Sequence, residues 1–206
     1  MKPNFELEDK LFQQGIRYVA GLDEVGRGCL AGPVAAGLVI FPQEIDRTLL
    51  IDINDSKKLS ESKRQSLDEV IRKYALVAEV AITEPDEIDE IGIVGATKLA
   101  MERCIQNSLI TPEHLLIDAI KLDGLHIESS SIIKGDQIST SIAAASIIAK
   151  VFRDELMIGL DSKYLGYGLS NNKGYGTKTH LEAIFTIGYS EIHRKSFDPI
   201  KSLIEK

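Results

Sequence analysis

The stretch from residue 18 to residue 33, Tyr-Val-Ala-Gly-Leu-Asp-Glu-Val-Gly-Arg-Gly-Cys-Leu-Ala-Gly-Pro, indicates how the chain folds and what it does. An apolar run leads into two adjacent carboxylates, Asp23 and Glu24, and a Gly-Arg-Gly turn precedes a second apolar run at 34–41. A purely structural hairpin favours Asn-Gly or Asp-Gly between alternating residues. Charges rarely stand at the edge of a core without a partner, and the natural partner of two crowded carboxylates is a hard divalent cation.

Length and composition limit the class of protein. The 206 residues suffice for one domain with a substantial core, and 44% hydrophobic with 27% charged residues is ordinary for a soluble globular protein. No apolar run approaches the roughly 20 residues that span a bilayer, and the first residues lack the apolar core of a signal peptide. Cys29 and Cys104 are too few for a disulfide framework and have no metal-like spacing. We therefore expect a cytoplasmic protein that does not enter a membrane.

The charge is unevenly distributed. The net charge of −7 argues against a polyanionic partner. Residues 163–206, however, hold 7 Lys and Arg against 4 Asp and Glu, so the C-terminal fifth is basic while the rest of the chain is acidic. A locally basic surface can hold phosphates. Scattered, solvated lysines fit these counts equally well.

The order of the predicted elements favours an α/β sandwich around a mixed sheet. Strands are predicted at 18–23, 34–41, 76–83 and 114–118, followed by a pair of short strands at 124–128 and 131–134. Helices are predicted after residue 60, from residue 85, over 95–109, from about residue 139 to 154, over 178–186 and at 199–205. Residues 1–15 are either a short helix or a frayed end, and 164–177 are predicted to be a loop. Small residues between 143 and 149 predict a helix that packs closely on the sheet.

Acids follow short apolar or small-residue stretches at three places: Asp23 with Glu24, Asp118, and Asp136. Sites in α/β sheets gather where strands end. Each like-charge pair at about 4 Å costs on the order of 4 kcal/mol at an effective dielectric near 20. Such a cluster persists only if some acids are protonated or a cation neutralises them. Oxygen ligands select Mg²⁺ or Mn²⁺ over zinc.

Each acid also has a purely structural interpretation. Adjacent Asp23 and Glu24 would point to opposite faces of a regular strand, and we expect Gly26 and Gly28 to bend the chain and bring both to one side. Taken alone, Asp118 fits a turn residue as well as a ligand. Asp136, judged by its position, is better explained as the cap of the helix that starts near residue 139.

Other polar positions divide in the same way. Asp154, next to an arginine on a helix, is predicted to be ion-paired or solvated. The four histidines are scattered and are predicted to be structural or exposed. Arg27 between two glycines suits a phosphate, and Tyr175 in Lys-Gly-Tyr-Gly-Thr (173–177) suits a sugar or base. Each of these motifs is weak alone.

Together and in this order, the motifs resemble ribonuclease HII, the prokaryotic type 2 ribonuclease H. The resemblance extends from about residue 17 to 200. It rests on Gly-Leu-Asp-Glu-Val-Gly-Arg-Gly (21–28), Leu-Ala-Gly-Pro-Val (30–34), Asp-Ser-Lys-Lys-Leu (55–59), Leu-Ile-Asp (116–118), Lys-Gly-Asp (134–136), Ser-Ile-Ala-Ala-Ala-Ser-Ile-Ile-Ala-Lys-Val-Phe-Arg-Asp (141–154), Gly-Tyr-Gly-Thr (174–177) and His-Arg-Lys-Ser-Phe (193–197).

The resemblance implies an RNase H-like fold, with a central mixed sheet flanked by helices and a small helical C-terminal extension. Residues 1–160 would form the catalytic domain, and 161–206 would form a substrate-contacting loop and extension packed on it. The implied enzyme is a monomeric endonuclease that cuts the RNA strand of RNA–DNA hybrids and nicks DNA duplexes 5′ of single embedded ribonucleotides. Mn²⁺ or Mg²⁺ would be its cofactor.

The resemblance also assigns roles to residues. Asp23, Glu24, Asp118 and Asp136 would be the catalytic, metal-binding carboxylates, so Asp136 becomes a fourth site acid. Gly26, Arg27 and Gly28 would contact the ribonucleotide 2′-OH and its phosphate, Tyr175 would stack on the next sugar, and Lys57 would bind substrate. Two positions depart from the family: Ala119 replaces the usual glycine and Cys29 a common proline. The methyl group of Ala119 puts metal affinity in doubt.

From the four acids at segment ends and the arginine turn we expect hydrolysis by two metal ions, leaving 3′-hydroxyl and 5′-phosphate ends. The absence of a Ser-His or Cys-His nucleophile pattern agrees with this mechanism. Two rival hypotheses remain. A non-catalytic hybrid-binding module would need the basic loop but not the acids. A small-molecule phosphatase would use the same carboxylates on a free phosphomonoester.

Overall fold

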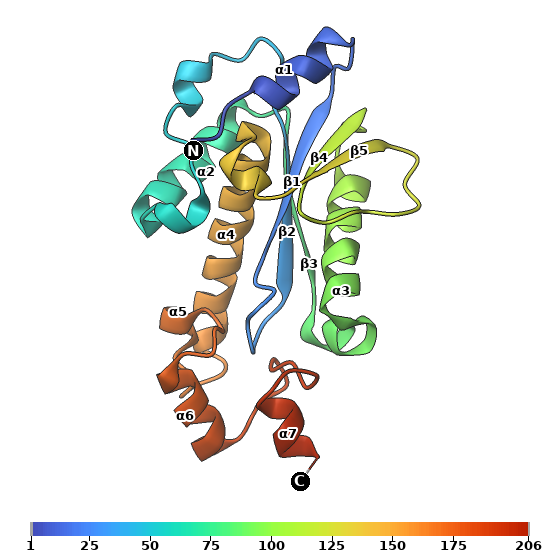
Figure 1. Ribbon diagram of the computed structural model, residues 1–206. Helices are drawn as coiled ribbons and strands as arrows, with labels where there is room; N and C mark the ends of the chain where they lie inside the picture. The colour runs from blue at the N-terminus through green and yellow to red at the C-terminus, as the bar shows by residue number, and fades with distance from the viewer. Residues whose placement is uncertain (1, 206) are drawn as a thin grey trace.

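A computed structural model describes residues 2–205 and contains a five-stranded sheet between helical layers (Figure 1). The strands lie in the order β3-β2-β1-β4-β5. Their bounds are β1 Val19–Val25, β2 Val34–Ile40, β3 Val77–Thr83, β4 His114–Asp118 and β5 Glu128–Ile132. β2 is antiparallel to β1 and β3, whereas β4 is parallel to β1 and β5. The predicted mixed sheet is confirmed.

Helices cover both faces of this sheet. They are α1 Glu6–Gln13, α2 Glu61–Tyr74, α3 Pro85–Asn107, α4 Thr140–Asp161, α5 Leu169–Asn172, α6 Lys178–Ile187 and α7 Ile200–Ile204, with 3-10 turns η1 Arg47–Leu50, η2 Ser56–Lys58 and η3 Gly135–Gln137. In Figure 1, α4 and α2 lie on one side of the strands and α3 lies on the other. None of the helices in residues 2–205 is both long and apolar enough to cross a membrane.

Successive residues of β1 face opposite sides of the sheet, one side covered by α3 and the other by α4. Ala20 and Leu22 pack into the cluster that contains the buried residues of α3. Gly21 faces α4 so closely that an added Cβ would lie 2.1 Å from the backbone carbon of Ser141. On β2, an added Cβ at Gly37 would lie 2.3 Å from the carbonyl oxygen of Ala145. The predicted close packing of the small-residue helix on the sheet is thus confirmed, and only glycine allows it at these two strand positions.

The prediction of two short strands at 124–128 and 131–134 is wrong. A single strand, β5, pairs with β4 from Glu128 opposite His114 to Ile132 opposite Asp118. Three consecutive serines occupy its middle, and this edge strand lies largely in solvent, so the segment lacks the apolar alternation that marks a half-buried strand. Gly124, at φ +80°, lies in the loop before it.

Two other boundaries differ from the prediction. The helices expected from residue 85 and over 95–109 form one element, α3, which is interrupted by Gly92 at φ 73°. Residues 164–177, predicted to be a loop, include the single-turn helix α5. Residues 1–15, left open between helix and frayed end, contain the two-turn helix α1.

The C-terminal segment packs against the end of the β1–β2 connection. Leu30 and Ala31, just after the Gly-Arg-Gly turn, share a buried cluster with Met157 of α4 and with apolar residues of the segment that carries α5, α6 and α7. Isolated bridges join Cys29 to Tyr175 and Ala31 to His193. Because of these contacts, the Gly-Arg-Gly turn lies between the sheet and the C-terminal segment.

Candidate active site

Strand pairing brings Asp23 and Asp118 together. β1 and β4 run parallel with Leu22 opposite Ile117, so the next residue on each strand is an acid. Both acids lie on the face of the sheet that α4 covers, because side chains alternate and Gly21 and Leu116, two residues earlier, face α4. The predicted gathering of acids at strand ends is therefore present for this pair.

Glu24 reaches the same region from the opposite face. β1 stays regularly paired through Glu24 opposite Ala36 and Val25 opposite Ala35, and the chain bends only at Gly26, with φ +94°. The expectation that the glycines bring both acids to one side of the strand is wrong, because the turn begins after the acids and the pleat keeps its alternation.

The environment of these acids is strongly unfavourable to negative charge. Burial raises the pKa of Asp23 well above its ordinary value, and repulsion from Glu24 and Asp118 adds to this, while the Ser146 hydroxyl opposes it. Burial also raises the pKa of Glu24, although Arg27, 3.2 Å away, lowers it. The second oxygen of Glu24, Oε2, is buried and has no hydrogen-bond partner within residues 2–205.

Asp136 extends this acidic region. It is buried in η3, where burial and the charges of Asp55 and Asp118 raise its pKa. The Gly135 N–H donates to Asp118 Oδ1 at 2.6 Å and so ties η3 to the end of β4. Asp136 is not the helix cap that its position alone suggested. Ser139 caps α4, because its hydroxyl accepts from the Ile142 N–H at 3.2 Å.

Asp55 is a buried acid that sequence reasoning did not single out. Its carboxylate accepts from the Lys57 N–H at 3.0 Å and from Gln137 Nε2 at 3.2 Å. It therefore fastens the 55–58 turn to η3, next to Asp136. The Asp-Ser-Lys-Lys-Leu segment was a visible signal, but the contact with residue 137 depends on the tertiary fold.

The donor chemistry of this region fits a hard divalent cation. Every nearby ligand is a carboxylate, one buried carboxylate oxygen is unpartnered, and burial together with repulsion between neighbouring acids raises the pKa of three of the acids. Within residues 2–205, however, no three Asp, Glu, His or Cys side chains converge as a ready-made metal cage. Mg²⁺ commonly binds through one or two carboxylates together with water and substrate phosphates, so the region suits an ion that binds together with its substrate.

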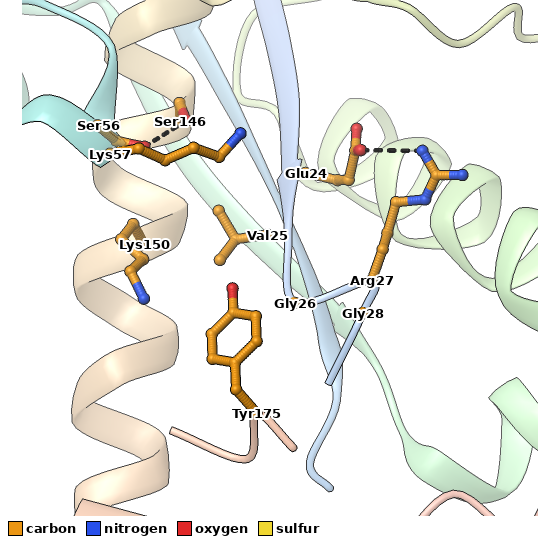
Figure 2. A pocket seen from close by; sticks show the side chains of 10 residues that line it. All are labelled: Glu24, Val25, Gly26, Arg27, Gly28, Ser56, Lys57, Ser146, Lys150 and Tyr175. Carbon is orange, nitrogen blue, oxygen red and sulfur yellow. Dashed lines mark hydrogen bonds and ion pairs between the residues drawn. The ribbon is translucent and has the colours of Figure 1, made fainter. Parts of the chain in front are cut away.

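A cavity of about 210 Å³ adjoins the acids (Figure 2). It is lined by Glu24, Val25, Gly26, Arg27, Gly28, Ser56, Lys57, Ser146, Lys150 and Tyr175. All five positions predicted to bind substrate are therefore side by side: the Gly-Arg-Gly turn, Lys57 and Tyr175. Figure 2 shows Lys57 reaching toward β1, Tyr175 entering the same space from the opposite end, and Arg27 turned toward Glu24.

Lys150 is a cavity residue that sequence reasoning missed. It lies one turn of α4 beyond Ser146, a spacing that was the available signal. Its Nζ is 2.7 Å from Asp154 Oδ1 and 5.6 Å from the centre of the Tyr175 ring. Asp154 also lies 3.8 Å from Arg64, so the prediction that Asp154 is ion-paired is confirmed.

Comparison with solved structures identifies the fold. The ribonuclease H2 of Pyrococcus horikoshii superimposes with a TM-score of 0.77 at 25% identity, covering 91% of this chain and 97% of that one. A ribonuclease HIII solved in complex with Mn²⁺, Bst-RNase HIII, shares the fold with a TM-score of 0.70 at 19% identity, over 94% of this chain and 71% of the other. The protein is thus an RNase H-like α/β protein with a group of acids at the ends of β1 and β4.

Comparison of sequences gives the family. The ribonuclease HII family model matches residues 20–200. A ribonuclease HII from Bacillus mycoides is 52% identical over 199 residues, which are 97% of this chain and 76% of the relative. The chain belongs to the ribonuclease HII family. It is a ribonuclease H, a divalent-metal-dependent hydrolase that acts on RNA–DNA hybrids.

Proposed function

We propose that this enzyme, besides cutting the RNA strand of hybrids, nicks DNA duplexes 5′ of single embedded ribonucleotides and leaves 3′-hydroxyl and 5′-phosphate ends. One observation carries the proposal: a single small cavity is lined by the Gly-Arg-Gly turn, by Tyr175 and by one of the acids, Glu24. A site that grips one nucleotide from two sides suits recognition of an isolated ribonucleotide better than recognition of a long stretch.

The Gly-Arg-Gly turn is suited to contact the 2′-OH and its phosphate. The 2′-OH is the group that distinguishes RNA from DNA at one position, so selectivity requires a contact to it. Gly26 cannot be replaced without strain, since an added Cβ would lie 2.2 Å from Arg153 Nε. Around Gly28 an added Cβ would meet nothing within 4 Å, which leaves this backbone open to a ligand. Arg27 adds a guanidinium at the rim, where it pairs with Glu24 in the free enzyme.

Tyr175 and two lysines would make the remaining contacts with the substrate. We assign Tyr175 to stacking on the sugar of the deoxyribonucleotide that follows the ribonucleotide, which favours RNA-to-DNA junctions. Lys57 and Lys150 line the same cavity and suit the flanking phosphates. The Lys150 ammonium also lies over the Tyr175 ring and would hold it in the stacking orientation.

Asp23, Glu24, Asp118 and Asp136 would hold the catalytic ions, Mg²⁺ or Mn²⁺. Two such ions would activate the attacking water and stabilise the departing 3′-oxygen. The chain contributes a buried, crowded set of acids. Their negative charges are more stable with a bound cation than without one. These carboxylates also fix where the scissile phosphate lies relative to the turn that recognises the 2′-OH.

We further propose how the chain is organised. Residues 1–160 would be the catalytic domain, and 161–206 a substrate-contacting extension on that domain, the whole acting as a monomer in the cytoplasm. The shared core around Leu30 and Met157 supports the first part. The buried free thiols of Cys29 and Cys104 suit a reducing compartment.

The test is incubation with a DNA duplex that carries one ribonucleotide, in Mg²⁺, Mn²⁺ or EDTA, with the nick mapped at nucleotide resolution. A single metal-dependent nick on the 5′ side of the ribonucleotide is expected, with the all-DNA duplex left intact. Cleavage confined to long hybrids, or cuts in the all-DNA control, would contradict the proposal. Binding that resists EDTA without any cleavage would instead favour the non-catalytic module.

A further inference from the structure

Arg194 is a fully buried cation that is satisfied by carbonyl groups alone. Its Nη2 and Nη1 donate to the carbonyls of Gly26 and Arg27, each at 2.8 Å, and its Nε donates to Gly32 at 3.0 Å. It forms no ion pair with a carboxylate within the part of the chain that the structure describes. A buried charge placed this way costs desolvation energy, so its position calls for a specific explanation.

The explanation lies in the turn that Arg194 contacts. In a trans peptide the C=O of one residue and the N–H of the next point in opposite directions. Because the carbonyls of Gly26 and Arg27 point at Arg194, the N–H groups of Arg27 and Gly28 point away from it. Neither of these two amides donates a hydrogen bond within residues 2–205. Arg194 therefore orients two free donors toward the side from which a ligand approaches, as in anion-binding loops.

A second buried arginine supports the next part of the same loop. Arg153 of α4 donates to the carbonyls of Ala31 at 3.1 Å, Pro33 at 2.9 Å and Lys173 at 2.8 Å. The last of these bonds reaches the segment that carries Tyr175. Buried guanidinium groups thus bind the backbone on both sides of the cavity, Arg194 at the Gly-Arg-Gly turn and Arg153 at the segment that carries Tyr175.

His193, the residue before Arg194, reaches Tyr175 through a chain of hydrogen bonds. The Ser190 N–H donates to His193 Nδ1 at 3.0 Å, which places the proton of the neutral ring on Nε2. His193 Nε2 lies 3.1 Å from His180 Nε2 and can donate to it, and His180 Nδ1 then donates to the Tyr175 carbonyl at 2.9 Å. Both rings are completely buried, and His193 packs 4.7 Å from the ring of Tyr167.

We propose that His193 and Arg194 together position the two substrate-recognising elements of the active site: Arg194 sets the amides of the Gly-Arg-Gly turn, and His193 sets Tyr175 through His180. The inference rests on the proposed function for the roles of the turn and of Tyr175. Both are positioning residues, since neither lines the cavity. Because they are consecutive, their Cα atoms are 3.8 Å apart, and one dipeptide links the two sides of the cavity.

Arginine is required for this arrangement because its planar fork presents several N–H groups in fixed directions, whereas lysine offers a single ammonium on a flexible stem. In Arg194→Lys we expect the turn to loosen. KM for the duplex with one ribonucleotide should rise about tenfold, and kcat should change less than about twofold. His193→Phe, which keeps a ring beside Tyr167 but removes the hydrogen-bond chain, should raise KM by a similar factor.

A double-mutant cycle separates positioning from general structural support. If His193 acts through Tyr175, His193→Phe should have no further effect on KM in a Tyr175→Ala background, whereas Arg194→Lys should keep its full effect there. Ile71→Val is the matched control, because Ile71 is fully buried in a core cluster on α2 that includes no cavity residue. It should lower Tm without changing KM.

Hydrogen exchange tests the same inference without any substrate. The Cys29 N–H donates to the Gly26 carbonyl at 3.3 Å, and the Leu30 N–H donates to the Gly174 carbonyl at 2.8 Å. Both amides should exchange faster in Arg194→Lys and not in Ile71→Val. The positioning inference is overturned if exchange at these amides is unchanged, or if His193→Phe raises KM equally with and without Tyr175. Failure of the wild-type enzyme to nick the single-ribonucleotide duplex would instead overturn the proposed function and leave the exchange result standing.

Discussion

Asp23 and Arg194 are both buried ionisable residues near the cavity, but their surroundings compensate their charges very differently. Asp23, at the end of β1, is 5% exposed and forms no ion pair within residues 2–205. Arg194, behind the Gly-Arg-Gly turn, is completely buried and likewise unpaired with an acid. The arginine is compensated by the four hydrogen bonds that it donates to backbone carbonyl groups. The aspartate accepts a hydrogen bond from the Glu24 N–H at 2.7 Å and one from the Ser146 hydroxyl, but it is buried among further acids that repel its charge.

The contrast shows which part of the site the folded chain completes by itself. Burial lowers the pKa of Arg194 to about 10, so the guanidinium stays charged at neutral pH and the turn is ready for a ligand. Burial and repulsion raise the pKa of Asp23, so the acidic end remains under electrostatic stress until a cation binds. In the proposed mechanism, the recognition turn is therefore preorganised by the folded chain, whereas the acidic site would be completed only by its metal ions.

The largest expected effect comes from removing the charge of Asp23, in the group of acids at the ends of β1 and β4. Asp23→Asn should reduce cleavage by at least about a thousandfold, or roughly 4 kcal/mol, because it removes a carboxylate that we propose as a metal ligand. In EDTA the same variant should be more stable than the wild type, with Tm higher by about 3 °C, because a crowded buried charge is gone. Single-turnover cleavage and calorimetry measure the two effects. Glu69→Gln, at an exposed position of α2, should change neither; a lower Tm for Asp23→Asn would mean that the acid supports the fold.

The next effect concerns His193, the residue before Arg194, and the stability of the protein at acid pH. Burial, and the nearness of His180, lower the pKa of His193 to about 4, from an ordinary 6.5. In this range the unfolded chain binds a proton that the folded chain does not, so stability is unaffected above pH 6.5 and falls as the pH drops toward 4, by roughly 3 kcal/mol in total. The acids with a raised pKa act in the opposite direction, since they favour the folded state at low pH.

Denaturant titration of the wild type and of His193→Phe between pH 7 and 4.5 isolates the histidine. The acid-dependent loss should be smaller in the variant by about 2 kcal/mol or more, since both chains carry the same acids. Equal pH dependence in the two proteins would mean that folding does not lower the pKa of His193, so the ring would not be held neutral in the hydrogen-bond chain to Tyr175.

A smaller effect tests whether the tyrosine side of the cavity recognises the junction. Tyr175→Ala should lower kcat/KM for the single-ribonucleotide duplex by about thirtyfold, equivalent to roughly 2 kcal/mol of stacking, with little loss of stability because the side chain is partly exposed. Tyr175→Phe is the matched control and should retain most of the activity, because the ring remains. An equal fall in Tm and activity in Tyr175→Ala would mean that the ring belongs to the core.

The sequence allowed the sheet and most of the acids to be predicted because those signals are local. Apolar strands that end in acids, as at Asp23 and Asp118, are visible in a short window, and β4 was predicted with the bounds that it has. β5 was not, because an edge strand with three serines carries no apolar alternation. The opposite directions of Asp23 and Glu24 were missed because the turn residues suggested an earlier bend than the pairing allows.

The contacts of Arg194 and His193 could not be predicted from the sequence, for a different reason. Arg194 contacts residues 26, 27 and 32, more than 160 positions away, and no periodicity links them. The histidines were expected to be structural or exposed, and His180 and His193 are buried, but the contact between these two depends on how the extension folds back. A buried arginine that binds only carbonyl groups has no partner side chain in the sequence to reveal it.

The smallest expected effect sharpens the comparison among the acids, at Ala119, where the resemblance to the family predicts a glycine. Ala119, directly after Asp118, has φ 51°, a left-handed conformation that costs a residue with a Cβ about 1–2 kcal/mol and glycine almost nothing. Ala119→Gly should therefore raise the stability by roughly 0.5–1 kcal/mol, after allowance for the greater freedom of glycine in the unfolded chain. It should also lower, by less than about threefold, the Mg²⁺ concentration that gives half-maximal cleavage, because the end of β4 relaxes beside its acid.

Lys134→Gly separates strain from metal binding. Lys134 is exposed, has φ 57° and lies two residues before Asp136, so it carries the same backbone strain on the neighbouring segment. It should gain a similar stability in a denaturant titration. If Ala119→Gly shifts the Mg²⁺ dependence and Lys134→Gly does not, the methyl group after Asp118 tunes the ion site itself. If Ala119→Gly destabilises the protein, the hydrogen bond from the Ala119 N–H to Ile132, at 3.0 Å, holds a backbone in which alanine is the better residue.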